Sequence, residues 1–342
     1  KNKEQIEDLE FVFDNKIKHG KLDYVTAWYF IAANFIKESS IKTAFVSTNS
    51  ICQGEQVSLL WGELIQNQNI IIHFAHQTFD WSNAAKSNAA VHCIIVGFAN
   101  FDTNQKYIFE YKNIKEEFTV LKVKNINPYL VSAPNFFIDK ARKPICNVPL
   151  LIRGNIPYDD GHLLLSEDEK NAVLQNEPQL KPFIKRYGGA RELLSNKWRY
   201  SLWLIDVTPD VIRNSTFLQD RLEKCKIFRE NSKSKSINSK SETPTLFGDI
   251  RQPKSDYLLV PRISSHRRKY FPIGFVKKEV ILADSSYGLP NATQFHFGII
   301  QSFMHNVWLR TVAGKLKSDF RYSNTIVYNN YPWPKEVSAK NK

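Results

Sequence analysis

Residues 43–98 decide the fold, and they read TAFVSTNSICQGEQVSLLWGELIQNQNIIIHFAHQTFDWSNAAKSNAAVHCIIVGF. The stretch opens with a β-rich run, residues 43–49, which ends in polar side chains. One apolar stripe at three- and four-residue spacing then predicts a helix that contains Val57, Leu60, Trp61, Leu64 and Ile65. Two continuous apolar runs follow, at residues 70–74 and 90–98. Such runs are typical of strands that are buried on both faces of an α/β sheet.

A polar segment with two large aromatic side chains separates these two predicted strands. Residues 78–88 read TFDWSNAAKSN and combine Phe79 and Trp81 with small and amide side chains. The segment is too polar for a core, so we interpret it as a loop at the sheet edge. Further along, apolar and charged residues alternate over residues 101–123, which predicts edge strands that leave the sheet.

Length and composition limit the class of protein. The chain has 342 residues, of which 42% are hydrophobic and 13% aromatic, so it can form two domains with cores. No apolar run is long enough to cross a membrane, and no signal-like segment opens the chain. The first residue is Lys1 rather than Met, and we expect a piece of a longer protein. The four cysteines lie far apart and form no CxxC pair, which favours free thiols in a reducing cytoplasm.

The net charge of +13, from 47 basic and 34 acidic residues, indicates a polyanionic partner. One basic segment is low in complexity and contains Lys233, Lys235 and Lys240. It is either a solvated, disordered loop or a loop that follows phosphates and becomes ordered on DNA. A second segment follows a predicted buried strand and presents Arg262, His266, Arg267, Arg268 and Lys269. We interpret it as a patch that faces a DNA groove, with a solvated turn as the alternative.

The character of the chain changes near residue 125. Prolines then recur at turns, strands are short and helices isolated, which indicates a separate α+β domain. Ser166 three residues before Glu169 predicts a helix start. Thr208 and Pro209 predict another, with an apolar side that continues to Phe228. A helix that ends near Gly314 is followed by three further cations that we expect to contact DNA, Lys315, Lys317 and Arg321.

Six blocks of this sequence resemble the MmeI-like (type IIL) restriction–modification proteins. They are LDYVTAWY (residues 22–29), FVSTNSICQGEQ (45–56), HFAHQTFDWSNAAK (73–86), PNAT (290–293), LKSDFRYSNT (316–325) and YPWP (331–334). The resemblance implies an α/β fold: the C-terminal half of a Rossmann-like, S-adenosylmethionine-dependent methyltransferase sheet, followed by an α+β target-recognition domain. The corresponding boundaries are residues 1–124 for the methyltransferase half, 125–316 for target recognition, and 317–342 for the start of a C-terminal helical region.

The resemblance also implies an activity and partners. The parent protein would be a bacterial, cytoplasmic DNA adenine methyltransferase that acts on double-stranded DNA and carries further methyltransferase and nuclease segments upstream. Methylating a base amine requires a methyl-donor site, a polar clamp on the amine and a pocket for the extruded base. The sequence contains neither a glycine-rich turn after a strand nor an Asn/Asp-Pro-Pro-Tyr/Phe clamp, which the family places upstream. We therefore expect no catalytic residue, no metal ligand and no bound S-adenosylmethionine in this chain.

The base pocket is the element that remains. Phe79 stands where the family places the aromatic side chain that stacks on the flipped base, and Trp81 is the second candidate; packing into the sheet edge is the alternative for either. Lys86, in the same segment, is expected to contact DNA.

Two other functions fit parts of the sequence. Asp102, Glu110 and Lys112 match the loose spacing of a metal-dependent nuclease, although alternating charges on an exposed hairpin explain them better. A stand-alone, non-catalytic DNA-binding specificity module is the other alternative.

Overall fold

The computed structural model describes residues 1–81, 91–111, 117–316 and 318–334, and these form two compact units. Unit 1 consists of Lys1–Cys146 and Val307–Pro332. Unit 2 consists of Asn147–Asn306 and the chain from Trp333. The predicted boundaries at residues 124 and 316 stay predictions about functional domains, because the limits of the compact units lie elsewhere.

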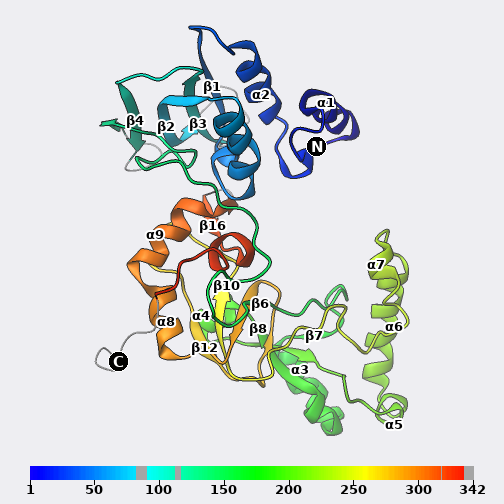
Figure 1. The fold of residues 1–342 in the computed structure, drawn as a ribbon. Coiled ribbons are helices and arrows are strands. Elements are labelled where there is room, and N and C mark those ends of the chain that lie inside the picture. The colour runs from blue at the N-terminus through cyan, green and yellow to red at the C-terminus, as the bar shows by residue number, and fades with distance from the viewer. Residues whose placement is uncertain (82–90, 112–116, 317, 335–342) are drawn as a thin grey trace. The chain divides into compact units, whose positions relative to one another are not determined.

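Unit 1 contains one five-stranded sheet in the order β1-β3-β2-β4-β5 (Figure 1). Only the β2–β4 pair is parallel; the other neighbours are antiparallel. The elements are α1 (Lys3–Phe13), α2 (Thr26–Phe35), β1 (Lys42–Thr48), two π-helical segments η3 (Val57–Trp61) and η4 (Glu63–Asn67), β2 (Ile71–Trp81), β3 (Val91–Ala99), β4 (Lys106–Tyr111) and β5 (Phe118–Val123). The predicted helix and strands of residues 43–123 are therefore present, but β4 and β5 continue the sheet instead of leaving it, and β4 lies inside it between β2 and β5.

Helices cover one face of this sheet, and the side chains between the helices and that face form the core of unit 1. The ring of Tyr29 in α2 lies 5.1 Å from Phe45 in β1, 5.6 Å from Trp61 in η3 and 5.7 Å from Phe98 in β3. The Tyr29 hydroxyl shares a 3.0 Å hydrogen bond with Ser47, so its polar end is satisfied inside the core. The side chains that alternate with these on the strands point to the opposite face.

Strand β2 is longer than the sequence predicts, and this corrects one expectation. Residues 78–81 continue the strand and pair with β3, in the register Phe79–Cys93 and Trp81–Val91. Phe79 is therefore at the end of a strand and not in a loop. Between the paired residues His76 and Phe79, two residues of β2 oppose one of β3, which is a β-bulge. This part of β2 contains polar residues, so a prediction based on apolar runs ends the strand too early.

A second, later piece of chain completes unit 1. It contains the hairpin β15 (Gly314–Leu316) and β16 (Asp319–Arg321) and the π-helical segment η6 (Asn324–Tyr328). The amide of Gly54 donates to the carbonyl of Val312 at 3.2 Å, and the amide of Ile145 donates to Asn329 at 2.8 Å. Backbone hydrogen bonds thus tie the two pieces of this unit together.

Unit 2 is the α+β arrangement of short strands that the sequence predicts. It has two four-stranded sheets, β12-β10-β14-β6 and β13-β8-β9-β7. Its strands are β6 (Ile152–Arg153), β7 (Leu164–Leu165), β8 (Ile184–Gly188), β9 (Arg199–Leu202), β10 (Tyr257–Pro261), β11 (Ile263–Ser264), β12 (Gly274–Val276), β13 (Ile281–Leu282) and β14 (Ser286–Pro290). Its helices are α3 (Glu167–Asn176), α4 (Ala190–Ser195), α5 (Pro209–Arg213), α6 (Thr216–Glu230), α7 (Lys235–Asn238) and α8 (Gln294–Gln301); α9 (Phe303–Val312) leads back to unit 1.

Both predicted helix starts are confirmed, but the predicted length of the second helix is wrong. Ser166 and Glu169 form the expected capping box at α3, with hydrogen bonds of 3.1 and 2.8 Å. The helix predicted to run from Pro209 to Phe228 is instead two helices. Ser215 accepts a hydrogen bond from the Leu218 amide at 3.0 Å and begins α6 as a new N-cap.

The low-complexity basic segment is ordered rather than a disordered loop, and it contains the short helix α7. Arg229, which is fully buried at the end of α6, holds the chain around it. Its guanidinium donates five hydrogen bonds of 2.7–2.9 Å to carbonyls, namely those of Pro157, Tyr158, Lys240, Thr243 and Leu246. One arginine thus fixes two segments that flank α6.

Within the described part of the chain, no helix is both long enough and apolar enough to span a bilayer.

Candidate nucleic-acid interface

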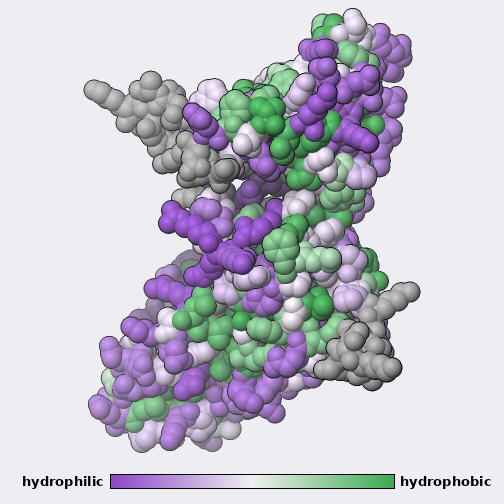
Figure 2. All heavy atoms as spheres, turned by 90° about the vertical axis from the view of Figure 1, so that its left-hand side faces the viewer, coloured by the Kyte–Doolittle hydropathy of each residue, from purple (hydrophilic) through white to green (hydrophobic). Residues whose placement is uncertain are grey.

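Aromatic side chains gather on the face of the unit 1 sheet that the helices leave uncovered. We call them the aromatic cluster, and its members are Phe74, His76, Phe79, Trp81, Phe109, Tyr111 and Phe118. Figure 2 views the molecule from the side of β4 and shows hydrophobic side chains in green between hydrophilic ones in purple. A partly exposed aromatic surface is the kind of platform on which nucleobases stack.

The bulge in β2 brings Phe79 into this cluster. Side chains of a regular strand alternate between faces, so residues three apart point to opposite sides. Because the bulge adds one residue, Phe79 joins His76 on the same face, with the ring centroids 6.3 Å apart. Trp81, two residues further, lies 6.3 Å from Phe79 and is 48% exposed. The structure therefore places both predicted stacking residues together at the end of β2, with Trp81 the more accessible.

Two residues that the sequence did not single out support Phe79. The ring of Tyr111 in β4 stacks on Phe79, with the centroids 5.5 Å apart and the planes at 26°. The Tyr111 hydroxyl in turn shares a 2.9 Å hydrogen bond with Nδ1 of His76. Burial lowers the pKa of His76 and raises the pKa of Tyr111, so both side chains are neutral at pH 7. No spacing rule links these three residues, since they meet only through the pairing of β2 with β4.

The other side of the same strand end is polar. Asp80 and His92 oppose each other in the β2–β3 register, and the Asp80 Oδ1 atom lies 2.8 Å from His92 Nδ1. This pair joins the end of β2 to the start of β3. Lys86, predicted to contact DNA, lies in the segment between them and outside the described residues.

Asp102 and Glu110, the two described residues of the nuclease alternative, do not converge. Asp102 lies before β4 and pairs with Lys106 at 2.8 Å, and this hydrogen bond lowers the pKa of its carboxyl. Glu110 lies near the other end of β4, and Lys112 is outside the described residues. In the part of the chain that the structure describes, no three His, Cys, Asp or Glu side chains are grouped to hold a metal.

The described residues of unit 1 do not fit a methyl-donor site either. Such a site needs glycines in the turn that follows a strand, so that the backbone can approach the donor. Gly54, the one glycine between β1 and β2 with a positive φ (+55°), packs against Gly314 of the same unit. Gly97 lies within β3 under the ring of Phe74.

The basic patch predicted near β10 is present on the surface of unit 2. His266, Arg267, Arg268 and Lys269 are exposed, and the Lys269 amine lies 5.4 Å from the centroid of the Tyr270 ring. Arg262, immediately after β10, is partly buried. Its guanidinium donates to the Asp284 carbonyl at 2.9 Å and lies 3.7 Å from the Asp284 carboxylate, which also pairs with Arg153 at 3.4 Å.

The second basic segment lies elsewhere in unit 2. Lys233 and Lys235 are exposed and Lys240 is half-buried, all three at or next to α7. Figure 1 places α7 at the outer end of α6, away from β10. The structure therefore does not bring the two predicted basic segments of this unit together.

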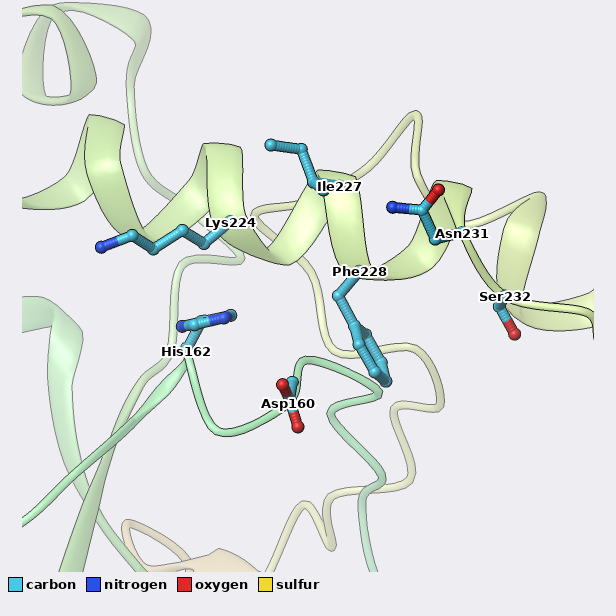
Figure 3. Close-up of a pocket in the computed structure, with 7 residues that line it drawn as sticks. All are labelled: Asp160, His162, Lys224, Ile227, Phe228, Asn231 and Ser232. Carbon is cyan, nitrogen blue, oxygen red and sulfur yellow. The ribbon is translucent and has the colours of Figure 1, made fainter.

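An open pocket of about 400 Å³ lies beside this segment, between α6 and the loop before β7 (Figure 3). Phe228 points from α6 toward the loop that carries Asp160, and His162 lies below Lys224. Asn231 and Ser232 complete its border with the basic segment. None of the predicted DNA-binding residues lines it.

The last group of predicted cations belongs to the β15–β16 hairpin of unit 1. Lys315 is half-buried, with its amine 5.3 Å from the centroid of the Phe320 ring, and burial lowers its pKa. Arg321 is exposed, while Lys317 lies outside the described residues. Of these three, Arg321 is the one that the structure shows at the surface.

Comparisons with known proteins agree over the whole chain. Family models match the MmeI DNA-methyltransferase domain at residues 1–110 and the MmeI target-recognition domain at residues 132–335. A curated relative, DNA methyltransferase A of Bacillus subtilis (strain 168), is 39% identical over 343 residues, which cover all of this chain and 38% of the relative. A solved structure of the type IIL restriction–modification enzyme MmeI in complex with DNA has a TM-score of 0.93 and 43% identity. That match covers 99% of this chain and 45% of the solved one.

The chain thus spans less than half the length of either relative. The expected resemblance and fold class are both confirmed. The chain belongs to the MmeI-like family of type IIL restriction–modification proteins, and it carries sequence of that family's DNA-methyltransferase and target-recognition domains.

Proposed function

We propose that this chain is the base-binding and sequence-recognising part of a DNA adenine methyltransferase in a bacterial, cytoplasmic restriction–modification system. The complete protein transfers a methyl group from S-adenosylmethionine to the exocyclic amine of adenine. The aromatic cluster at the end of β2 carries the proposal, because an extruded base needs an aromatic surface to replace its lost stacking. Phe79, with Trp81 beside it, is the residue that stacks on the extruded adenine.

The methyl donor and the amine clamp come from other residues of the complete protein. This chain has no GxGxxG pattern and no Asn/Asp-Pro-Pro-Tyr/Phe motif. S-adenosylmethionine supplies the methyl group, and the residues described above contribute only the surface that receives the base. The isolated chain is therefore inactive, and upstream methyltransferase and nuclease segments are its partners within one polypeptide.

DNA contact falls mainly to unit 2. We assign phosphate contacts to Lys233, Lys235 and Lys240 and to His266, Arg267, Arg268 and Lys269, with Lys86, Arg262, Lys315, Lys317 and Arg321 as further contacts. The supporting observations are the net charge of +13 and the exposure of both basic segments. Arg262 already shares the carboxylate of Asp284, so part of its charge is already neutralised within the protein.

The test joins the chain to a donor segment. A fusion places the residues that precede the matched region of the Bacillus relative in front of this chain, and tritiated S-adenosylmethionine reports methyl transfer to DNA. We expect methylation of adenine by the fusion and none by the chain alone. By calorimetry the chain alone should show no saturable binding of S-adenosylmethionine, and micromolar binding would contradict the assignment.

A non-catalytic specificity module is the second candidate function. The same basic segments favour it, and it requires no donor site. The fusion separates the two: a fusion that binds DNA as well as the chain does, but transfers no methyl group, supports the module.

A further inference from the structure

Phe79 has a ring neighbour that fixes which of its faces a base can use. Tyr111 covers one face of Phe79 at a centroid distance of 5.5 Å, with the planes 26° from parallel. Stacked rings exclude a third ring from the shared face, so a base must approach from the other side. The direction of approach is therefore set by β4 as well as by β2.

Tyr111 is itself held in place by His76, which in turn packs on Phe109. Its hydroxyl is 2.9 Å from Nδ1 of His76, and either tautomer of a neutral histidine can form this hydrogen bond. The imidazole of His76 lies flat on Phe109, with the centroids 4.0 Å apart and the planes 1° from parallel. Phe109 and Tyr111 are both in β4, while His76 and Phe79 flank the bulge of β2. The four side chains interlock across the parallel strand pair.

We propose that Tyr111 is a positioning residue for base capture: anchored by His76, it backs the Phe79 ring so that an extruded purine completes a three-layer stack. This rests on the proposed stacking role of Phe79 and extends it to a residue that touches neither substrate nor donor. Stacking requires a defined orientation of the Phe79 ring. Because Tyr111 already restricts that ring in the free protein, Phe79 loses less side-chain entropy when a base binds.

The experiment uses the 342-residue chain and two duplexes that differ at one position. One duplex has a paired 2-aminopurine, and the other has the same purine opposite an abasic site, where extrusion costs little. Anisotropy of a distant dye gives both dissociation constants. We expect the chain to prefer the unpaired purine by about fivefold or more, the range expected for one stacked base.

Four variants then separate the roles. Phe79→Ala and Tyr111→Leu should both lose the preference while retaining binding to paired DNA. Tyr107→Leu is the matched control, because Tyr107 is on the same face of β4, at its other end, opposite Phe74. It should retain the preference. His76→Phe keeps a ring on Phe109 but cannot bond to Tyr111, and should reduce the preference by about threefold, as for one modest hydrogen bond.

Each result is decisive. If Phe79→Ala loses the preference and Tyr111→Leu keeps it, the positioning role is wrong and the stacking role stands. If Phe79→Ala keeps it, the stacking role fails, and the inference with it. Should Tyr111→Leu not fold, the pair His76→Phe and Tyr111→Phe decides. The two should cause equal losses, and their combination should cause no more than either, since they break the same hydrogen bond; additive losses or none would overturn the inference.

Discussion

Arg229 donates a 2.8 Å hydrogen bond from its Nε atom to the carbonyl of Tyr158, a residue 71 positions earlier in the chain. Four more carbonyls accept from the same guanidinium, so its buried charge is surrounded by acceptors on every side. A buried arginine without a carboxylate partner is rare, and hydrogen bonds to its charged group compensate for lost hydration.

Replacing this arginine should destabilise unit 2 strongly. Arg229→Met leaves five carbonyls without their donor, and we expect a loss of about 3 kcal/mol or more in the free energy of unfolding. Urea unfolding measures it. Arg213→Met is the control: Arg213 is exposed and pairs with Asp210, so its loss should stay within about 0.5 kcal/mol. Limited proteolysis should cut the Arg229 variant within residues 231–246 first, and equal resistance of both variants would count against the anchoring role.

Two glycine-to-alanine changes should have opposite signs. A Cβ on Gly154 would lie 2.0 Å from the carbonyl oxygen of Ala283, and backbone cannot move aside, so Gly154→Ala should cost about 1–3 kcal/mol. Gly298 is in the exposed middle of α8 with nothing near the new methyl group. Gly298→Ala should therefore stabilise by about 0.5–1 kcal/mol. Thermal melting of both variants tests the pair, and a shift of the same sign in both would contradict it.

Unit 2 should lose stability in mild acid because of one histidine. Burial lowers the pKa of His305 to about 3, below its unfolded value near 6.5. Between pH 3 and pH 6.5, His305 is therefore protonated in the unfolded chain and neutral in the folded chain. This contribution to stability is complete above pH 6.5 and declines, on the order of 3–5 kcal/mol, as the pH falls toward 3. Urea midpoints at pH 7 and 4.5 measure the slope, which His305→Gln should flatten.

Neutralising two exposed cations should weaken binding to DNA of any sequence. Arg267→Gln with Arg268→Gln removes two candidate phosphate contacts, so the slope of log K against log salt should flatten by about 2. Titrations at several salt concentrations with an unrelated duplex provide the measurement. Arg191→Gln with Lys197→Gln, two exposed cations around α4, is the matched control of equal charge. A slope that changes equally in both would place the contact surface elsewhere.

Phe79→Ala should cost far less stability than truncating a core aromatic residue. Its ring is partly exposed and its closest ring neighbour is Tyr111, so we expect a loss of about 1 kcal/mol rather than the 3–5 kcal/mol of a buried phenylalanine. Phe98→Ala in the core of the same sheet is the comparison. A melting temperature that falls equally in the two variants would favour packing over stacking for Phe79.

Much of the architecture could be read from local patterns. Apolar runs predicted the strands of unit 1, and Ser166 with Glu169 predicted the start of α3, because these signals act over a few residues. The sequence also identified Phe79 and Trp81 as neighbours, and the structure places them together.

What could not be read depends on pairing between distant residues. The bulge after His76 is set by the register with β3, and nothing in residues 76–79 marks it. Tyr111 contacts Phe79 only because β2 pairs with β4. Arg229 donates to carbonyls that lie both before and after it in the sequence. The order of residues 231–241 was missed for that reason: their composition favours disorder, but the buried guanidinium outweighs it.

The two-piece construction of unit 1 has a consequence for how the protein is made. Residues 1–146 leave the ribosome first, but the β15–β16 hairpin and η6, which bond to Gly54 and Ile145 through their flanks, follow only after residues 147–306. At 5–20 residues per second the delay is roughly ten to thirty seconds. During that time the five-stranded sheet of unit 1 lacks the second piece of its unit, while residues 147–306 of unit 2 can already fold. A chain stalled before residue 307 would therefore contain unit 1 without its second piece, and we expect a chaperone to matter most during this interval.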